Sequence, residues 1–473
     1  MANLNEKNEN MTGVSGSGVH SAQAVASATL SGTIAALMES KKYATVRDIL
    51  LTMQPVDIAA LFEELYPQKL SLIFRLLPKD LASDTFVEMS SELQAELIRC
   101  FSDRELKDVL DELYMDDTVD LVEEMPASIV KRILSQANPE ERQLINEMLK
   151  YPADSAGSIM TTEFVDLYPN MTVAAAIEHI RETGVDKETI NVCYVTNKSR
   201  QLIGEVSIRS LILADSASAV EDIMTKNTIS VPTHEDKENV AHVFTKYGCI
   251  VVPVVDSEER LVGIVTVDDA ITVIRDEATE DIDVMAAITP SDKPYLKQSA
   301  FHIYLSRIPW LMLLMISATF TGSIITHFED ALSAYIILAA SIPMLMDTGG
   351  NCGSQASVTV IRGISLQEIQ FRDTFRVLWK EFRVSLLCGI TLAVVNFGKL
   401  MLINRVTVPI AAVISLTLLF TVFFAKLVGC FLPILAKKLG FDPAVMASPF
   451  ITTIVDALSL FIYFQMATII LGI

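Results

Sequence analysis

The last third of the chain consists largely of apolar runs that are long enough to cross a lipid bilayer. A transmembrane helix needs about 20 consecutive, mainly apolar residues. Helices also satisfy their own backbone polar groups, as lipid requires. The sequence therefore predicts a transmembrane domain of five α-helices within residues 306–473, over the runs 308–328, 334–361, 384–403, 408–435 and 444–471.

Basic residues are unevenly shared among the loops between these runs. The loops after the second and fourth runs together carry seven Lys and Arg, whereas the loop between the third and fourth runs carries two. Cytoplasmic loops carry the excess of Lys and Arg. We therefore expect a multi-pass protein of the cytoplasmic (inner) membrane, with a cytoplasmic N-terminal half and an external C-terminus. The N-terminus shows no apolar signal segment that contradicts this orientation.

The first 300 residues are strongly acidic, with 26 Lys and Arg against 50 Asp and Glu. Such a surface does not suit nucleic acid, whose phosphates are bound by basic residues, but it attracts cations. Six cysteines without a C-x-x-C spacing indicate reduced, structural thiols. The composition therefore favours a membrane protein with an acidic soluble half and no nucleic-acid partner.

The acidic half begins with a tail, residues 1–28, that we expect to be disordered because it lacks a periodic apolar pattern. Residues 29–153 show short amphipathic helices separated by prolines, which predicts a stacked, all-α domain. Its most acidic window is YMDDTVDLVEE, where Asp116 and Asp120 share one helix face. That face is either a cation surface or simply solvated.

Residues 155–276 contain an internal repeat. The segment Ile-Met-Thr at 159–161 recurs at 223–225, and Ile-Gly-Glu-Val-Ser at 203–207 recurs as Val-Gly-Ile-Val-Thr at 262–266. Each copy predicts the order helix, strand, strand, helix. The pattern resembles a tandem pair of CBS domains, α/β regulatory modules that commonly bind adenosine nucleotides, here at 154–218 and 219–274.

The CBS resemblance implies one nucleotide site at most. In the second copy, GIVTVDD places Thr266 and Asp268 on a ribose, so ATP or another adenosine nucleotide is an expected cofactor. The first copy has Ser207 and Arg209 at these positions and lacks the Asp. A pair that only transmits conformation is the alternative.

Residues 275–305 form a connecting segment whose helical part carries like charges. Glu277 and Asp281 are four residues apart, and Glu277 and Glu280 are three apart. Like charges at these spacings repel on one helix face. A cation held between this face and a second acidic surface removes the penalty.

Asp456 is a carboxylate inside the fifth apolar run, close to the expected bilayer midplane. Polar residues at steps of three and four place it on a polar stripe with Ser448, Thr452, Ser459 and Tyr463. Ionisable residues in membrane spans are costly and functional by default. The alternatives are an ion pair with Lys426 in the fourth run, or protonation.

The second run contains PMLMDTGGNCGSQ, residues 343–355. Its proline and glycines predict a weakened or interrupted helix, whose freed carbonyls can coordinate a cation. Asp347, Asn351, Ser354 and Gln355 add side-chain oxygens. The alternative is close helix packing through small residues.

The oxygen ligands exclude a typical soft-metal site and favour Mg²⁺, Ca²⁺ or Mn²⁺. A single carboxylate suits hydrated Mg²⁺ better than dehydrated Ca²⁺, because Mg²⁺ keeps its waters. Two copies around a two-fold axis serve better than one, so a homodimer with a shared pore is a hypothesis. The expected pore ligands are Asp456, Asp347, Asn351, Gly350 and Thr452.

The order of these parts, with TGGNCGSQ followed by Ile-Arg-Gly at 361–363, resembles the MgtE family of magnesium channels and transporters. The resemblance implies a homodimer in which Asp456 binds hydrated Mg²⁺ and the connecting helix plugs the cytoplasmic mouth. It also implies that cytosolic Mg²⁺ bridges the plug to other acidic surfaces. The implied gating residues are Glu277, Glu280 and Asp281 on the plug, Asp442 facing it, Asp236, Glu238 and Asp269 on the CBS pair, and Asp116 and Asp120 in the helical domain.

The sequence thus predicts a Mg²⁺-gated pathway for Mg²⁺ influx, not an enzyme, since no phosphate-binding G-x-x-x-x-G-K-[ST] motif of an ATPase appears. Two alternatives stay open. One is a Co²⁺/Mn²⁺ or proton-coupled cation carrier. The other is a membrane-anchored CBS nucleotide sensor, against which the intramembrane carboxylates weigh.

Overall fold

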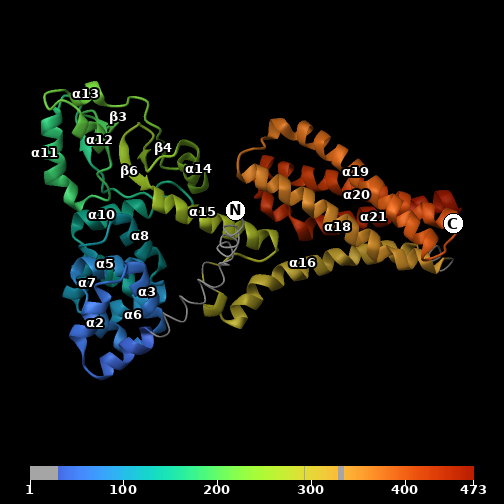
Figure 1. Ribbon diagram of the computed structural model, residues 1–473, viewed down its shortest axis with the longest axis horizontal. Helices are drawn as coiled ribbons and strands as arrows, with labels where there is room; N and C mark the ends of the chain where they lie inside the picture. Colours follow the sequence, from blue (N-terminus) through green and yellow to red (C-terminus); the bar gives the residue numbers. More distant parts are fainter. Residues whose placement is uncertain (1–29, 66, 292, 294, 329–334, 473) are drawn as a thin grey trace, which may run out of the picture. The chain divides into compact units, whose positions relative to one another are not determined.

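The structure, a computed structural model, describes residues 30–472 except 66, 292, 294 and 329–334. The expected tail at 1–28 lies outside the described residues. The chain divides into two compact units, Met1–Ile271 and Thr272–Ile473 (Figure 1). The first unit holds the helical domain and the CBS pair, and the second holds the long apolar helices.

Prolines set where the short helices of the first unit begin. Pro55 and Pro139 occupy the first turns of α3 and α10, and Pro78 and Pro126 stand just before α5 and α9. A missing N–H costs nothing at these positions. Alternate helices pack together, α3 on α5, α5 on α7 and α7 on α9. The helices are Leu30–Glu39, α2 Tyr43–Leu50, α3 Pro55–Glu64, α4 Pro67–Phe74, α5 Lys79–Val87, α6 Ser91–Cys100, α7 Asp103–Leu110, α8 Met115–Glu124, α9 Ala127–Gln136 and α10 Pro139–Met148.

The repeat forms two three-stranded sheets of identical order, which confirms the CBS architecture. The first strand of each sheet runs parallel to the second, and the third is antiparallel to it. These first strands have only two residues each, too few for the alternation that marks a strand, and the sequence did not predict them. The first copy contains β1 Asp166–Leu167, α11 Val173–Thr183, β2 Val192–Thr196, β3 Leu202–Ser207 and α12 Ile208–Leu213; the second contains α13 Val220–Ile223, β4 Val231–Pro232, α14 Lys237–Tyr247, β5 Val251–Val255 and β6 Leu261–Thr266.

The Ile-Met-Thr segment of each CBS copy pairs with the third strand of the other copy. Thr161 forms a β-bridge with Ile264 of the second copy, and Thr225 forms one with Glu205 of the first. At each of these bridges, the methionine of the Ile-Met-Thr segment lies against a glycine of the other copy. A Cβ on Gly263 would lie 2.7 Å from Met160 Sδ, and one on Gly204 would lie 2.9 Å from Met224 Sδ. The close crossing therefore requires both glycines.

In the described part of the second unit, five long helices correspond to the five apolar runs: α16 Ala300–His327, α18 Ile336–Ser365, α19 Thr374–Leu402, α20 Val408–Lys438 and α21 Ser448–Leu471. Four segments of the described chain, corresponding to α16, α19, α20 and α21, are long and apolar enough to cross a membrane. The other long helix, α18, carries the polar PMLMDTGGNCGSQ segment. α18, α20 and α21 pack against one another around a buried apolar core (Figure 1).

The expectation that the second run is interrupted is wrong, because α18 is continuous from Ile336 to Ser365, with Pro343 inside it. Its glycines serve close packing instead. A Cβ on Gly349 would meet Thr421 at 2.7 Å, and one on Gly353 would meet Ile451 at 2.7 Å. The small residues let α20 and α21 approach the α18 backbone closely.

Helix α15, Val267–Met285, follows β6 directly and is also continuous. The expected boundary between the CBS pair and the connecting segment, at 274/275, falls inside this helix. The boundary between the two compact units, after Ile271, falls inside it as well.

Candidate functional site

Asp456 lies on α21, half-buried, and its charge interacts with that of Asp347 on α18. The alternative in which Asp456 pairs with Lys426 is wrong. Lys426 Nζ instead lies 3.7 Å from Glu381 Oε2 of α19, and the two side chains are 7% and 16% exposed. Glu381 therefore neutralises this lysine, and the charge that acts on Asp456 is that of another acid, Asp347.

The hydroxyls that share the stripe with Asp456 are bound to backbone carbonyls. Thr452 donates to Pro449 O at 2.9 Å, Ser459 to Val455 O at 2.6 Å, and Tyr463 to Leu338 O at 3.0 Å. The Tyr463 bond ties α21 to α18. The side chain of Ser448 lies outside the described residues. These hydroxyls face the bundle interior, as their spacing predicts.

Three polar side chains of α18, four residues apart, form an exposed line that we call the α18 polar stripe: Asp347, Asn351 and Gln355. Four-residue steps place them on one helix face. Gly350 lies elsewhere on the helix, buried, where a Cβ would meet Thr452 Cγ2 at 2.9 Å. The structure therefore brings the charge of Asp456 near that of Asp347, with Asn351 one turn further along the same face of α18. Gly350 and Thr452 pack against each other where α18 meets α21.

The acidic end of α15 contacts the end of α18 within the second unit. Ser365 Oγ donates to Asp281 Oδ2 at 3.4 Å. Burial and the nearby charge of Asp442 raise the pKa of Asp281 above its usual range. Asp442 itself accepts the N–H of Ala444 at 2.7 Å and caps the short helix Pro443–Met446. Asp442, which the sequence expectation placed opposite the plug, is thus one of the negative charges that act on Asp281.

The apolar side of the same helix end secures this contact. Val284 and Met285 pack against a buried cluster made by Ile361, Ala444 and Ala447. Glu277 is half-buried and Glu280 is exposed on the preceding turns of α15. The charge of Glu280 adds to the rise in the pKa of Asp281.

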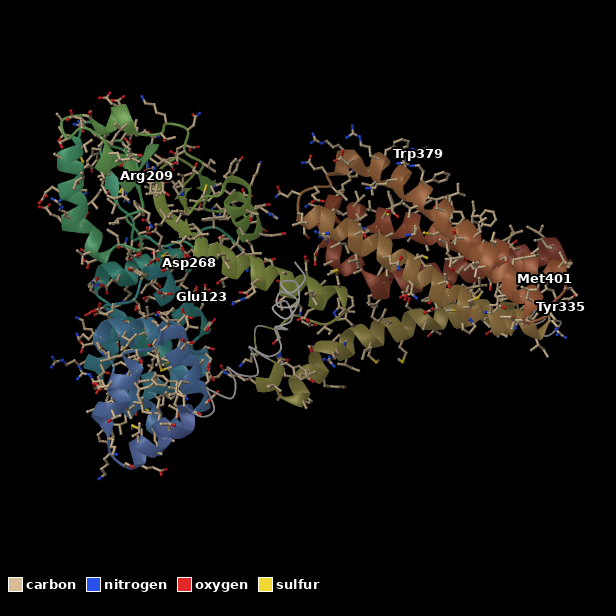
Figure 2. All side chains as sticks on the ribbon, viewed as in Figure 1. Glu123, Arg209, Asp268, Tyr335, Trp379 and Met401 are labelled. Atoms are coloured by element: carbon tan, nitrogen blue, oxygen red, sulfur yellow. The ribbon has the colours of Figure 1, made fainter. Side chains whose placement is uncertain are left out.

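A second group of carboxylates gathers within the first unit, and we call it the acidic cluster: Asp116, Asp117, Asp120, Glu188 and Asp269. Helix α8 supplies the first three, a loop of the first CBS copy supplies Glu188, and the start of α15 supplies Asp269. Figure 2 labels Glu123 on α8 and Asp268 on α15 beside this region.

Burial and mutual repulsion raise the pKa values throughout the acidic cluster. Burial, with the charges of Asp269 and other acids, raises the pKa of Asp117 to about 6. Burial, with the charges of Asp268 and Asp269, raises the pKa of Glu188 to about 7. Partial desolvation, with the charge of Asp117, raises the pKa of Asp120 to about 7, although its side chain still reaches solvent. The pKa of Asp116 is also raised, chiefly by burial.

The other predicted CBS residues are placed differently. Asp236 caps α14 by accepting the N–H of Glu238 at 2.8 Å, and Glu238 lies 3.8 Å from His242. Neither acid is among the charges that raise the pKa values of the acidic cluster. Thr266 is buried and donates to Asp269 Oδ2 at 2.5 Å, while Asp268 is exposed at the start of α15.

Sequence reasoning missed two members of the acidic cluster. Asp117 is adjacent to a predicted residue in the acidic window, so the window itself was its signal. Glu188 lies in a loop with no motif, and only the fold brings it to α8. Among the described residues, no three Asp, Glu, His or Cys side chains converge closely enough to hold a metal ion directly. Hydrated Mg²⁺ fits such spaced carboxylates, because it keeps several of its waters.

Family models match successive parts of the chain. They are the MgtE intracellular N domain at residues 53–154, the CBS domain at 156–217 and 220–276, and the divalent cation transporter MgtE at 342–466. A solved structure described as the soluble part of a magnesium transporter covers 53% of this chain and 99% of its own, with 30% identity and a TM-score of 0.50.

Two curated relatives extend over nearly the whole length. The magnesium transporter MgtE of Thermus thermophilus is 36% identical over 430 residues, which is 90% of this chain and 95% of that protein. The magnesium transporter MgtE of Bacillus subtilis (strain 168) is 34% identical over 440 residues, 91% of this chain and 95% of that protein. The chain therefore belongs to the MgtE family of magnesium transporters, and it is a membrane transporter rather than an enzyme.

Proposed function

We propose that this Mg²⁺ transporter carries Mg²⁺ into the cytosol through a pore beside Asp456, and that cytosolic Mg²⁺ closes the pore. The membrane potential favours entry, since a divalent ion gains about 4.6 kcal/mol per 100 mV. The observation that carries the proposal is the packing of the acidic end of α15 on the end of α18, where Asp281 accepts from Ser365 and is repelled by the charge of Asp442. A cation that bridged these two acids would remove the repulsion.

The α18 polar stripe supports a pore shared by two chains. Asp347, Asn351 and Gln355 are exposed on one chain, at a depth where lipid would otherwise surround them. Polar and charged side chains in membrane spans face a water-filled path or another part of the bundle. A second copy that placed its own stripe opposite would enclose such a path. We therefore propose a homodimer, with Asp456 and Asp347 as outer-sphere ligands of hydrated Mg²⁺.

The gating proposal rests on charge repulsion in two places. Asp281 and Asp442 repel at the end of α15, and the acidic cluster repels between α8 and the CBS pair. Mg²⁺ bound at either place removes the repulsion and favours the packed arrangement. Loss of Mg²⁺ restores it and releases α15 from the bundle. In this proposal Glu277 and Glu280 assist Asp281, and Asp236 and Glu238 add to the negative field.

Orientation and nucleotide binding belong to the same proposal. With the first unit in the cytosol and five crossings, the C-terminus is external. Thr266 and Asp268 at the start of α15 are the proposed ribose contacts of ATP or another adenosine nucleotide. A nucleotide there would touch the residue next to Asp269 and so affect the acidic cluster.

The test is Mg²⁺ uptake into liposomes that contain the full-length protein and a Mg²⁺-sensitive dye, at low and millimolar Mg²⁺ on the cytosolic face. Replacing Glu277, Glu280 and Asp281 with Ala should give uptake that cytosolic Mg²⁺ no longer shuts. Asp276→Ala is the matched control, because Asp276 lies on the same helix in an exposed ion pair with Arg275. Undiminished inhibition in the triple variant contradicts the gating role.

A further inference from the structure

A cavity of about 320 Å³ lies at the end of the long-helix bundle, between the last turns of α18 and α20 and the turn that follows α18. Its inner wall is made by Ile364, Ile369 and Ile434, and its rim by Phe371, Lys437 and Lys438. None of these residues belongs to the ion pathway or to the gating surfaces described above.

The cavity has an apolar wall and a basic rim. Ile364 and Ile434 belong to a buried apolar cluster on which Ile369 packs. Lys437 and Lys438 are exposed at the rim, and Lys438 Nζ lies 4.1 Å from the centroid of the Phe371 ring. Within the part of the chain that the structure describes, neither lysine forms an ion pair. The rim therefore offers two positive charges next to an apolar surface.

The backbone holds this wall in place. The N–H of Ile369 donates to Gly363 O at 2.8 Å. A Cβ on Gly363 would lie only 2.5 Å from Ile369 Cδ1, so the glycine allows Ile369 to close against α18. Gln367 adopts a left-handed conformation, with φ of 55°, and turns the chain back toward the cavity. The cavity is thus a formed feature of the fold.

The cavity lies on the cytosolic side of the bundle. Ser365, one residue from the inner wall, contacts Asp281 of α15, which follows the intracellular domains. The surrounding segment 362–383, with Lys437 and Lys438, carries seven basic and three acidic residues. Trp379, exposed on α19, provides the aromatic side chain typical of a membrane interface (Figure 2). Anionic lipids give the cytoplasmic leaflet its negative surface.

We propose that this cavity binds an anionic phospholipid of the cytoplasmic leaflet. The lipid phosphate lies between Lys437 and Lys438, and part of an acyl chain covers Ile364, Ile369 and Ile434. Basic pockets between transmembrane helices on the cytoplasmic side bind such head groups. A free phosphate ion would leave the apolar wall uncovered, whereas a phospholipid satisfies both halves of the cavity.

The test is native mass spectrometry of delipidated full-length protein, titrated with phosphatidylglycerol or with phosphatidylcholine of the same chains. Wild-type protein should retain phosphatidylglycerol preferentially. The variant Lys437→Gln/Lys438→Gln should lower its affinity for that lipid by about tenfold or more, since each lysine near anionic lipid contributes about 1 kcal/mol. The control Lys399→Gln/Arg405→Gln removes the same charge from the other end of the bundle and should change nothing.

Two further arms separate the lipid from other ligands. Gln370→Trp, which fills the cavity mouth without removing a charge, should also lower phosphatidylglycerol binding. Millimolar inorganic phosphate should fail to displace the lipid. The proposal is overturned if the double lysine variant binds like wild type, if the control loses as much affinity, if Gln370→Trp has no effect, or if inorganic phosphate displaces the lipid.

Discussion

Asp456 shares one face of α21 with hydroxyl groups that already donate hydrogen bonds elsewhere. Because Thr452, Ser459 and Tyr463 donate to backbone carbonyls, they line the interior without neutralising the carboxylate. The neighbouring charge is that of Asp347. Among the residues that the structure describes, neither acid has a basic partner, which favours cation binding over a structural ion pair.

Asp456→Asn keeps the size of the side chain and removes its charge. Mg²⁺ uptake by the reconstituted protein should fall by about tenfold to a hundredfold, since hydrogen bonds to a charged group contribute about 1.5–3 kcal/mol. Asp373→Asn, which alters a carboxylate paired with Arg376 outside the pathway, should leave uptake unchanged. Equal uptake by the Asp456 variant and wild type would remove this residue from the pore.

The buried pair Lys426–Glu381 has a structural role that can be measured separately. Lys426→Met leaves Glu381 buried without a counter-charge, which costs about 3–5 kcal/mol when one partner of a buried pair is removed. Thermal unfolding in detergent should therefore shift to lower temperature. Adding Glu381→Leu should restore much of the loss. Equal stability of Lys426→Met and wild type would show that the pair contributes nothing.

At the scale of single elements, glycine decides how closely the long helices pack. A Cβ on Gly429 of α20 would lie 2.3 Å from the carbonyl oxygen of Gly353 on α18. This neighbour is backbone and cannot rotate away. The two helices therefore pack with their backbones in contact at this crossing.

Gly429→Ala should destabilise the bundle by about 1–3 kcal/mol, the usual cost of overpacking. Gly398→Ala in α19, where nothing lies within 4 Å of the added Cβ, should instead be neutral or stabilising by about 0.5–1 kcal/mol. The stability of both variants is measured by thermal unfolding of the full-length protein in the same detergent. A Gly429 variant as stable as the Gly398 variant would contradict the close crossing.

The same helices show what sequence alone could and could not predict. Apolar runs placed all five long helices, because length and hydropathy are local properties. The glycines of α18 predicted an interruption, and this was wrong because a glycine pattern does not distinguish a freed backbone from a close neighbour. Similarly, the sequence made Asp456 a candidate partner of Lys426, and only the arrangement of α19 assigned this lysine to Glu381.

At the scale of the whole molecule, the acidic cluster makes stability depend on pH. Its folded-state pKa values, about 6 for Asp117 and about 7 for Glu188, lie above the usual values of these groups. The folded form therefore holds more protons than the unfolded form between about pH 4 and 7. The contribution of the acidic cluster to the free energy of unfolding is greatest below about pH 4. This contribution is lost as the pH rises through the folded-state pKa values.

Hydrogen exchange of α8, corrected for the intrinsic rate, should report this loss in the full-length protein without Mg²⁺. The free energy of local opening of α8 should fall as the pH rises from about 5 to 7.5. Millimolar Mg²⁺ should reverse this fall, most strongly at the higher pH. Asp117→Asn/Glu188→Gln should flatten the pH profile. A profile that is already flat in wild type would show that these carboxylates do not repel.

The domain order was predictable because each part has its own signature: short amphipathic helices, an internal repeat, and long apolar runs. The acidic cluster was predictable only in part. Asp116 and Asp120 lay in an acidic window, whereas Glu188 comes from a loop about 70 residues away in sequence whose position depends on the CBS fold.

The β-bridges between the two CBS copies affect the order in which the chain can fold. Thr161 pairs with Ile264, which is synthesised roughly a hundred residues later. The segment that contains Thr161 therefore leaves the ribosome long before Ile264 has been made. Such long-range pairing is slow and leaves strand edges open in the meantime. A nascent chain that stalls before Leu261 therefore lacks the partner of Thr161, although the first copy can already form its own buried core.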